Sequence, residues 1–203
     1  MANYNKEYFF VQQSDDDRLP LLTATENTMN RNYLFEIMDF GSPPLIFFNG
    51  AKEYQKKFGI VGVKDVANIL FNGVNLLVCS KIRDELISAE VKFLHMHPAV
   101  YIDDFENRHE DYWFLTFTER FDCWDREKSD YEIDPVELGN YRYHSVYSYS
   151  LDVDLIEQTP MDERLLFKLG GTQDAFVVCH KSLATLFSGN GKNGVQLVAV
   201  DEF

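Results

Sequence analysis

The chain has 203 residues, of which 45% are hydrophobic and 15% aromatic, and its formal net charge is -14. This length and composition predict a folded protein with a continuous core and argue against a disordered chain. An acidic chain lacks the positive footprint that phosphate backbones require, so direct binding to nucleic acid is not expected.

The cellular compartment is also suggested by composition. The first residues contain no apolar run of signal-peptide length behind a basic start, and no segment approaches the roughly 18 apolar residues of a membrane span. We therefore expect a cytoplasmic protein with no membrane partner. Cys79, Cys123 and Cys179 are an odd number of cysteines in apolar surroundings, which is typical of reduced, buried thiols and not of a disulfide framework.

Short elements are predicted for the first third of the chain. Residues 6–13 and 32–40 are rich in aromatic and β-branched side chains and predict strands, and the glycine and prolines of 41–44 end the second one. Residues 51–58 and 64–71 carry apolar side chains at spacings of three and four, which predicts two short helices.

The same unit is predicted twice further on. Residues 75–101 predict a strand, a short helix with Ser80 as its N-cap, and a second strand. Residues 175–200 have a similar sequence pattern and predict the same three elements. Three identical pairs, each 100 positions apart, carry the repeat: Cys79 and Cys179, Lys81 and Lys181, and Leu86 and Leu186. We interpret the cysteines as buried strand residues and the leucines as anchors of the helix on the sheet.

A nucleophilic role for these cysteines is not expected. A reactive thiolate needs a neighbouring base and an electropositive setting. His180 follows Cys179 directly, but consecutive side chains of a strand point to opposite faces.

The region between the two units predicts further strands, within 110–122 and 140–156. The order of elements favours the α+β class over a doubly wound sheet. We predict a single domain, residues 1–203, with a mixed, mostly antiparallel sheet, short helices, and two strand-helix-strand units that flank a β-rich acidic middle.

This acidic middle is the most distinctive feature of the sequence. Residues 101–163 hold 18 Asp and Glu against 5 Lys and Arg, a local net charge of -13. Two interpretations stay open for 121–135: a solvated loop whose Trp124 and Tyr131 pack into the core, or a surface that grips a basic partner. On the second interpretation the partner-binding residues are Asp103, Asp104, Glu106, Asp122, Trp124, Asp125, Asp130, Tyr131 and Glu132.

Enzymatic chemistry has weaker support. His95 and His97 are two apart on a predicted strand and project from the same face, so a metal-dependent hydrolase is an alternative, with a further ligand from Asp103, Asp104 or His109. Such pairs are common by chance, and we expect neither a metal nor a cofactor. The glycine-rich stretches 169–174 and 188–194 lack the order and spacing of a phosphate loop and are interpreted as turns.

Three stretches carry a resemblance to a known family: 76–101, 111–132 and 165–200, with an acidic turn marked by Asp122, Asp125 and Ser129. They resemble immunity protein family eleven of bacterial polymorphic toxin systems, formerly a domain of unknown function. The resemblance covers residues 74–203, and 1–73 match only loosely.

The resemblance implies a non-enzymatic cytosolic protein that is made beside a toxin, often a nuclease, and that binds and neutralises it. A nuclease needs a basic face for its substrate, and carboxylates arranged like phosphates would occupy that face. A scaffold module that binds some other basic protein is a further alternative with the same surface.

Overall fold

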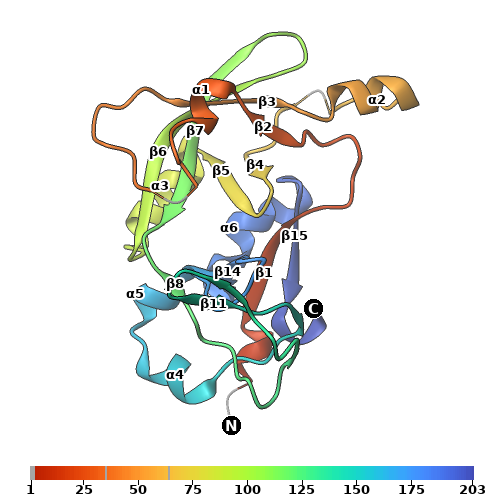
Figure 1. Ribbon diagram of the computed structural model, residues 1–203. Coiled ribbons are helices and arrows are strands. Elements are labelled where there is room, and N and C mark those ends of the chain that lie inside the picture. Colours follow the sequence, from red (N-terminus) through yellow and green to blue (C-terminus); the bar gives the residue numbers. More distant parts are fainter. Residues whose placement is uncertain (1–2, 35, 64) are drawn as a thin grey trace.

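A six-stranded sheet dominates one half of the molecule (Figure 1). The computed structural model describes residues 3–34, 36–63 and 65–203. The six strands follow one another in space as β2 (Leu22–Ala24), β3 (Leu45–Asn49), β6 (Leu94–Ile102), β7 (Arg108–Phe117), β5 (Asn75–Cys79) and β4 (Ile69–Asn72). All neighbours are antiparallel except β3 and β6.

A five-stranded sheet forms the other half. Its spatial order is β15 (Val195–Ala199), β1 (Tyr8–Gln13), β14 (Val177–His180), β13 (Leu166–Leu169) and β8 (Arg120–Phe121). The acidic segment between β8 and β13 adds two separate ribbons: β9 (Asp130–Tyr131) with β12 (Val146–Ser148), and β10 (Val136–Leu138) with β11 (Tyr141–Tyr143). The predicted α+β class is therefore confirmed.

The helices are all short. The α-helices are α1 (Glu26–Met29), α2 (Lys52–Phe58), α3 (Ser80–Ser88), α4 (Val153–Gln158), α5 (Met161–Arg164) and α6 (Ala184–Ser188). Single 3-10 turns are η1 (Tyr4–Lys6), η2 (Lys181–Leu183), η3 (Gly189–Gly191) and η4 (Val200–Glu202). In the described ranges, none of these helices has both the length and the apolar character needed to span a bilayer.

Two predicted elements were wrong, and a third was only partly right. The described part of 32–40 contains no strand, and its apolar side chains at Ile37 and Phe40 stay exposed because no neighbouring strand pairs with them. The predicted helix at 64–71 is replaced by strand β4, whose consecutive apolar residues are all buried, as in a strand covered on both faces. Phe35 and Lys64 lie outside the described residues. The predicted strand in 140–156 is present only as the two short strands β11 and β12. Helix α4 follows them, and the carboxylate of Asp152 caps it by accepting a hydrogen bond from the amide of Leu155.

The two repeated units share one topology. In the first unit, β5 and β6 both run antiparallel to β7, which lies between them. In the second, β14 and β15 flank β1 in the same way. Each unit is therefore a split strand-helix-strand motif. The sequence repeat predicted the two similar units but not the third strand inserted in each of them.

The details of the two units differ from the prediction. The N-cap of α3 is Cys79, and Ser80 is its first helical residue, where its hydroxyl accepts a hydrogen bond from the Trp113 indole. Leu86 is buried and anchors α3 as expected. In α6 the fully buried anchor is Phe187, and Leu186 is only partly buried.

The main hydrophobic core joins the two sheets. One cluster includes Phe47, Leu86 and Phe114 of the six-stranded half together with Val177, Phe187 and Val195 of the five-stranded half. A second cluster lies under the acidic ribbons and includes Phe10, Trp124, Ile156, Leu169 and Val200. The shared cluster supports the single-domain prediction, which remains a prediction.

Substitution of Phe187 tests whether the halves unfold together. Phe187→Ala should lower the free energy of unfolding by about 3–5 kcal/mol, because the buried ring contributes to the shared cluster and its loss leaves a cavity. Denaturant unfolding would be followed in two backgrounds, each retaining one of the two tryptophans. Both probes should shift together, whereas Phe58→Ala on the exposed face of α2 should change little. A shift seen by only one tryptophan would contradict a common core.

Candidate partner-binding surface

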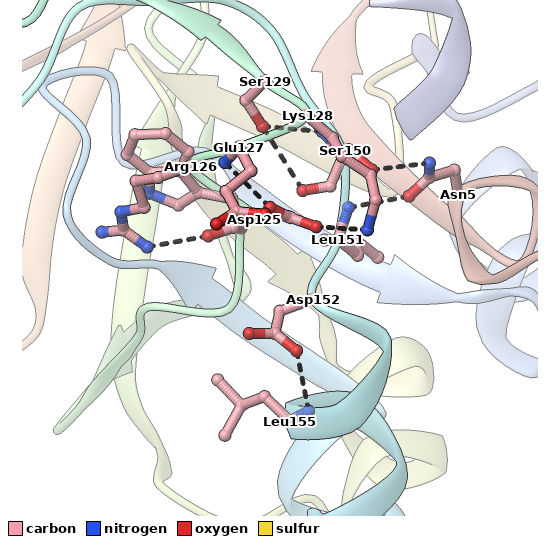
Figure 2. Close-up of polar contacts among 11 residues, drawn as sticks. Asn5, Asp125, Arg126, Glu127, Lys128, Ser129, Ser150, Leu151, Asp152 and Leu155 are labelled. Carbon is pink, nitrogen blue, oxygen red and sulfur yellow. Dashed lines mark hydrogen bonds and ion pairs between the residues drawn. The ribbon is translucent and has the colours of Figure 1, made fainter.

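The acidic turn at 122–129 pairs its charges internally. One carboxylate oxygen of Asp125 accepts from the amide of Glu127 at 2.9 Å, and the other accepts from Nζ of Lys128 at 2.5 Å (Figure 2). The carboxylate of Asp122 lies 2.6 Å from the guanidinium of Arg126. Asp122 and Asp125, which we predicted to contact a partner, therefore each form an ion pair with a neighbouring cation of the same turn.

Ser129 fastens the same turn to the body of the protein. Its hydroxyl accepts from the amide of Ser150 at 3.0 Å and donates to the Ser150 carbonyl at 3.4 Å, while the amide of Asp125 donates to that carbonyl at 2.7 Å (Figure 2). Asn5 adds to these hydrogen bonds, since its side chain donates to the Ser150 hydroxyl and accepts from the Leu151 amide. The acidic-turn motif thus has a structural role in this chain.

The hydrogen bond from Lys128 also sets the ionisation of the turn. It lowers the pKa of Asp125, with support from the Glu127 amide, and this outweighs the opposing effect of burial. The carboxylate of Asp125 is therefore ionised at neutral pH, and its charge stabilises the turn.

Trp124 is not available to a partner, which corrects its predicted role. Its side chain is 1% exposed and its indole donates to the carbonyl of Gly170 at 3.2 Å. The Arg126 guanidinium covers the ring at 3.8 Å, and the half-buried ring of Tyr131 packs edge-on at 4.9 Å. The rings of Trp124 and Tyr131 therefore pack against the core, as expected if 121–135 form a solvated loop.

The loop of Asp103, Asp104 and Glu106 lies apart from the acidic turn. It joins β6 to β7 at the top of the molecule in Figure 1, whereas β8 and β11 lie in the lower half. The ten residues of β7 separate the two regions, and a strand of that length spans roughly 33 Å. The nine predicted residues therefore do not form one continuous surface.

Asp103 organises its own loop. Its carboxylate accepts from the amides of Phe105 and Asn107, each at 2.9 Å, and pairs with the imidazole of His109 at 3.0 Å. Burial raises the pKa of Asp103, but the hydrogen bonds from Asn107 and His109 outweigh it and bring the pKa to about 2. The carboxylate of Asp104 accepts from the Asn49 amide group, and Glu106 is exposed.

The alternative metal site is not assembled. His97 lies 3.0 Å from the carbonyl of Pro43 and 3.5 Å from the Arg31 guanidinium, and His95 is exposed. His109 binds Asp103 at the other end of the β6–β7 hairpin. Across residues 3–34, 36–63 and 65–203, no three His, Cys, Asp or Glu side chains are grouped as metal ligands would be.

The cysteines lie in the core. Cys79, Cys123 and Cys179 are free and buried, as predicted. Burial raises the pKa of the Cys179 thiol to about 12 and raises that of Cys123 as well. Both thiols are therefore protonated at neutral pH and are poor nucleophiles.

The β10–β11 hairpin exposes apolar side chains that sequence reasoning did not single out. The hairpin surface, as we name it, comprises Asp130, Glu132, Ile133, Asp134, Val136, Leu138, Tyr141 and Tyr147. Its five large apolar side chains are 47% to 82% exposed, and carboxylates alternate with them along the chain. The missed signal is the two-residue loop Gly139–Asn140, in which Gly139 has a positive φ of 63°.

A cleft of about 820 Å³ opens beside this hairpin. Tyr141 and Tyr143 line one part of it, and the end of β7, β8 and β13 contribute other parts. Four cationic side chains line it, although the surrounding region is acidic: Arg120, Arg126, Arg142 and Lys168.

Lys168 is the most unusual of these cations. It is 8% exposed, and its Nζ donates to the side-chain oxygen of Asn75 at 2.6 Å. Among the described residues it forms no ion pair. Burial lowers the pKa of Lys168 to about 8, and the charge of Arg120 acts in the same direction.

The comparison with known families identifies the chain. A family model described as "Immunity protein family (Imm11)" matches residues 25–201. The chain belongs to this immunity protein family. The match begins well before residue 74, so the family region includes β3 and β4, and the narrower limits expected from the sequence are corrected. No curated protein matches the chain.

Membership in the immunity protein family indicates a protein that neutralises a toxin. The family match covers β3 to β15, including both acidic ribbons, whereas β1 and β2 precede it. The acidic turn and the hairpin surface are therefore parts of the family region, and their different chemistry assigns them different roles. The turn holds the fold together, and the hairpin surface faces solvent.

Removal of the Asp125 carboxylate should weaken this immunity-family fold. Asp125→Ala should lower the free energy of unfolding by about 1–2 kcal/mol at pH 7, because the Glu127 amide and Lys128 lose their acceptor. The folded pKa of Asp125 is lowered, so its contribution is present above the unfolded value near 3.9 and is lost as the pH falls through the folded value. Urea unfolding at pH 7 and pH 3 measures both effects. Equal destabilisation by Asp134→Ala, an exposed control, would contradict the role of the turn.

The buried charge of Lys168 should lower the free energy of unfolding of the protein. Lys168→Met should raise the free energy of unfolding at pH 7 by about 1–3 kcal/mol, because a pKa lowered from 10.5 to about 8 reflects a charge that folding removes from water. The folded pKa lies below the unfolded one, so wild-type stability rises between pH 8 and 10.5 and the advantage of the variant shrinks there. Urea unfolding at pH 7 and 9.5 measures this, with exposed Lys56→Met as the control. A less stable Lys168→Met protein at pH 7 would refute it.

Proposed function

We propose that this immunity-family protein binds a cognate toxin protein through the hairpin surface and neutralises it as a non-enzymatic inhibitor. The observation that carries the proposal is the exposure of five large apolar side chains on the two small ribbons and the segment that joins them. Three of these side chains lie on the β10–β11 hairpin, whose strands pair only with each other in the part of the chain that the structure describes. Membership of the immunity protein family supplies the kind of partner.

The exposed side chains support a contact with another protein. Contiguous apolar groups on a protein surface, surrounded by polar ones, are typical of binding sites. Tyrosines are enriched among the residues that dominate binding energy, and Tyr141 and Tyr147 are both largely exposed here. A two-stranded ribbon has little stability by itself, so contact with a partner would stabilise it further.

The charge of the same surface favours a basic partner. Asp130 and Asp134 form no ion pair with any side chain in the described ranges, so their carboxylates can meet cations of a toxin. Glu132 accepts from the Tyr147 hydroxyl at 2.8 Å and keeps other acceptor sites. The local net charge of -13 over 101–163 would speed the encounter at low salt.

A nuclease-type toxin would suit this surface. Such an enzyme presents cations to phosphates, and the carboxylates of the hairpin surface could occupy those positions. We propose a different set of contacts from the one that we expected from the sequence. Asp130, Tyr131 and Glu132 remain at or beside the surface, whereas Asp122, Trp124 and Asp125 serve the acidic turn and the core.

The proposal is tested with the toxin encoded by the neighbouring gene. Calorimetric titration should show tight binding by the wild-type protein, and Tyr141→Ala should weaken it at least ~30-fold, because a truncated hot spot costs about 2 kcal/mol or more. Asp134→Lys should slow association, and the effect should fade at high salt. Glu110→Lys reverses an exposed charge near the start of β7 and is the matched control.

The possible results distinguish an error in the proposed binding surface from an error in the proposed function. No binding of the toxin by the wild-type protein, and no protection of cells that express the toxin, would reject the function. Tight binding that survives Tyr141→Ala and Asp134→Lys would reject the hairpin surface and keep the function.

A further inference from the structure

The basic side chains of the acidic middle gather at one place. Residues 101–163 contain five Lys and Arg in all, and three of them, Arg120, Arg126 and Arg142, line the cleft beside the hairpin. Lys168 from β13 adds a fourth cation, whereas the lining contains the carboxylates of Glu119 and Asp122 only. The cleft is therefore a positively charged site in a strongly negative region.

Two of these cations are already occupied. The Arg126 guanidinium binds the Asp122 carboxylate, donates to the carbonyl of Trp124 at 2.8 Å and covers its ring. Arg142 lies 3.2 Å from the carboxylate of Glu137 across the hairpin. Their charges still contribute to the field of the cleft, but most of their donors are used.

Arg120 and Lys168 are different, because they lie side by side without an anion. They are register partners in the parallel pair β8–β13, so their side chains leave the sheet on the same face. In the part of the chain that the structure describes, neither has a carboxylate partner. The guanidinium of Arg120 lies over the Tyr143 ring at 5.6 Å, and Lys168 has one neutral acceptor on Asn75.

Such a pair is costly without a ligand. Two like charges repel each other, and the ammonium group of a lysine that is 8% exposed is largely removed from water. An ammonium carries three donors, and that of Lys168 has one identified acceptor. A group retained at a cost to stability is typical of a functional site.

We propose that Arg120 and Lys168 form a binding site for a phosphate-type oxyanion, carried by a small molecule that occupies the cleft. A doubly charged tetrahedral anion offers acceptors to both the guanidinium fork and the ammonium group, which a single carboxylate does less well. The cleft of about 820 Å³ is larger than one phosphate group and falls within the size range of small-molecule sites.

The aromatic wall of the cleft fits an organic phosphate. The rings of Tyr141 and Tyr143 lie 6.3 Å apart between centroids and nearly parallel, at 29°. Stacked tyrosines provide a face for a planar group such as a nucleobase. Arg120 and Lys168 line the cleft and are not part of the hairpin surface, whereas Tyr141 belongs to both sites.

Binding of inorganic pyrophosphate to the purified full-length protein tests the proposal. Isothermal titration at pH 7 and low salt should show saturable binding of pyrophosphate, with succinate much weaker. Lys168→Met and Arg120→Gln should each weaken pyrophosphate at least ~10-fold, because each removes one of the two paired cations. Arg108→Gln, which removes an exposed arginine of β7 outside the cleft, should change the affinity less than about twofold.

Several outcomes would overturn the site. They are absence of pyrophosphate binding, equal binding of succinate, unchanged binding by both cleft variants, or an equal loss in Arg108→Gln. Thermal unfolding of each variant excludes misfolding as the cause, and Lys168→Met is expected to be the more stable protein. A parallel titration with ADP separates two sources that both support the site: tighter binding than pyrophosphate indicates a nucleotide, and equal binding indicates the phosphate groups alone.

Discussion

Burial of the Trp124 ring is the interaction on which the acidic region depends. The ring lies in the second hydrophobic cluster, and its indole donates to Gly170 at the end of β13. Around it, Asp122 and Arg126 pair on the solvent side, and Ser129 bonds to Ser150. The conformation of the strongly charged acidic turn is thereby fixed, because the Trp124 side chain is buried and the charged side chains on either side of it form ion pairs within the turn.

This arrangement divides the negative charge into two classes. Carboxylates near the ring are bound by Arg126, Lys128 or backbone amides, and they stabilise turns. Carboxylates of the hairpin surface stand beside exposed apolar side chains and face solvent. The cations that remain are concentrated in the cleft between the hairpin and the sheets. The net charge of the region therefore does not show that the acidic hairpin surface lies next to a cleft lined by basic side chains.

Much of the fold could be predicted from the sequence, and the reasons are local. The strand-helix-strand units follow from buried runs around Cys79 and Cys179, and the α+β class follows from the order of elements. The errors at 32–40 and 64–71 concern segments whose apolar spacing is compatible with more than one structure, so tertiary pairing decided them.

The candidate site was harder to predict than the fold. Sequence identifies charges but not their partners, so Asp125 beside Lys128 and Asp103 beside His109 looked available when they are bound. Neighbouring positions in the chain also concealed the distance between the Asp103 loop and the acidic turn, which β7 separates. The pairing of Arg120 with Lys168 depends on a register between strands 48 residues apart in sequence (168 minus 120), and no local pattern reports it.

The position of β1 has a consequence for how the molecule assembles. Strand β1 is an inner strand of the five-stranded sheet, between β14 and β15, which follow it by more than 160 residues in sequence. The six-stranded half takes its strands from one continuous stretch, 22–117, whereas the other half combines β1 with strands from 120–199. We expect the five-stranded sheet to form last, because pairing of strands so far apart in sequence is slow. The cleft and the hairpin surface should therefore form only after β15 has been synthesised and has paired with β1.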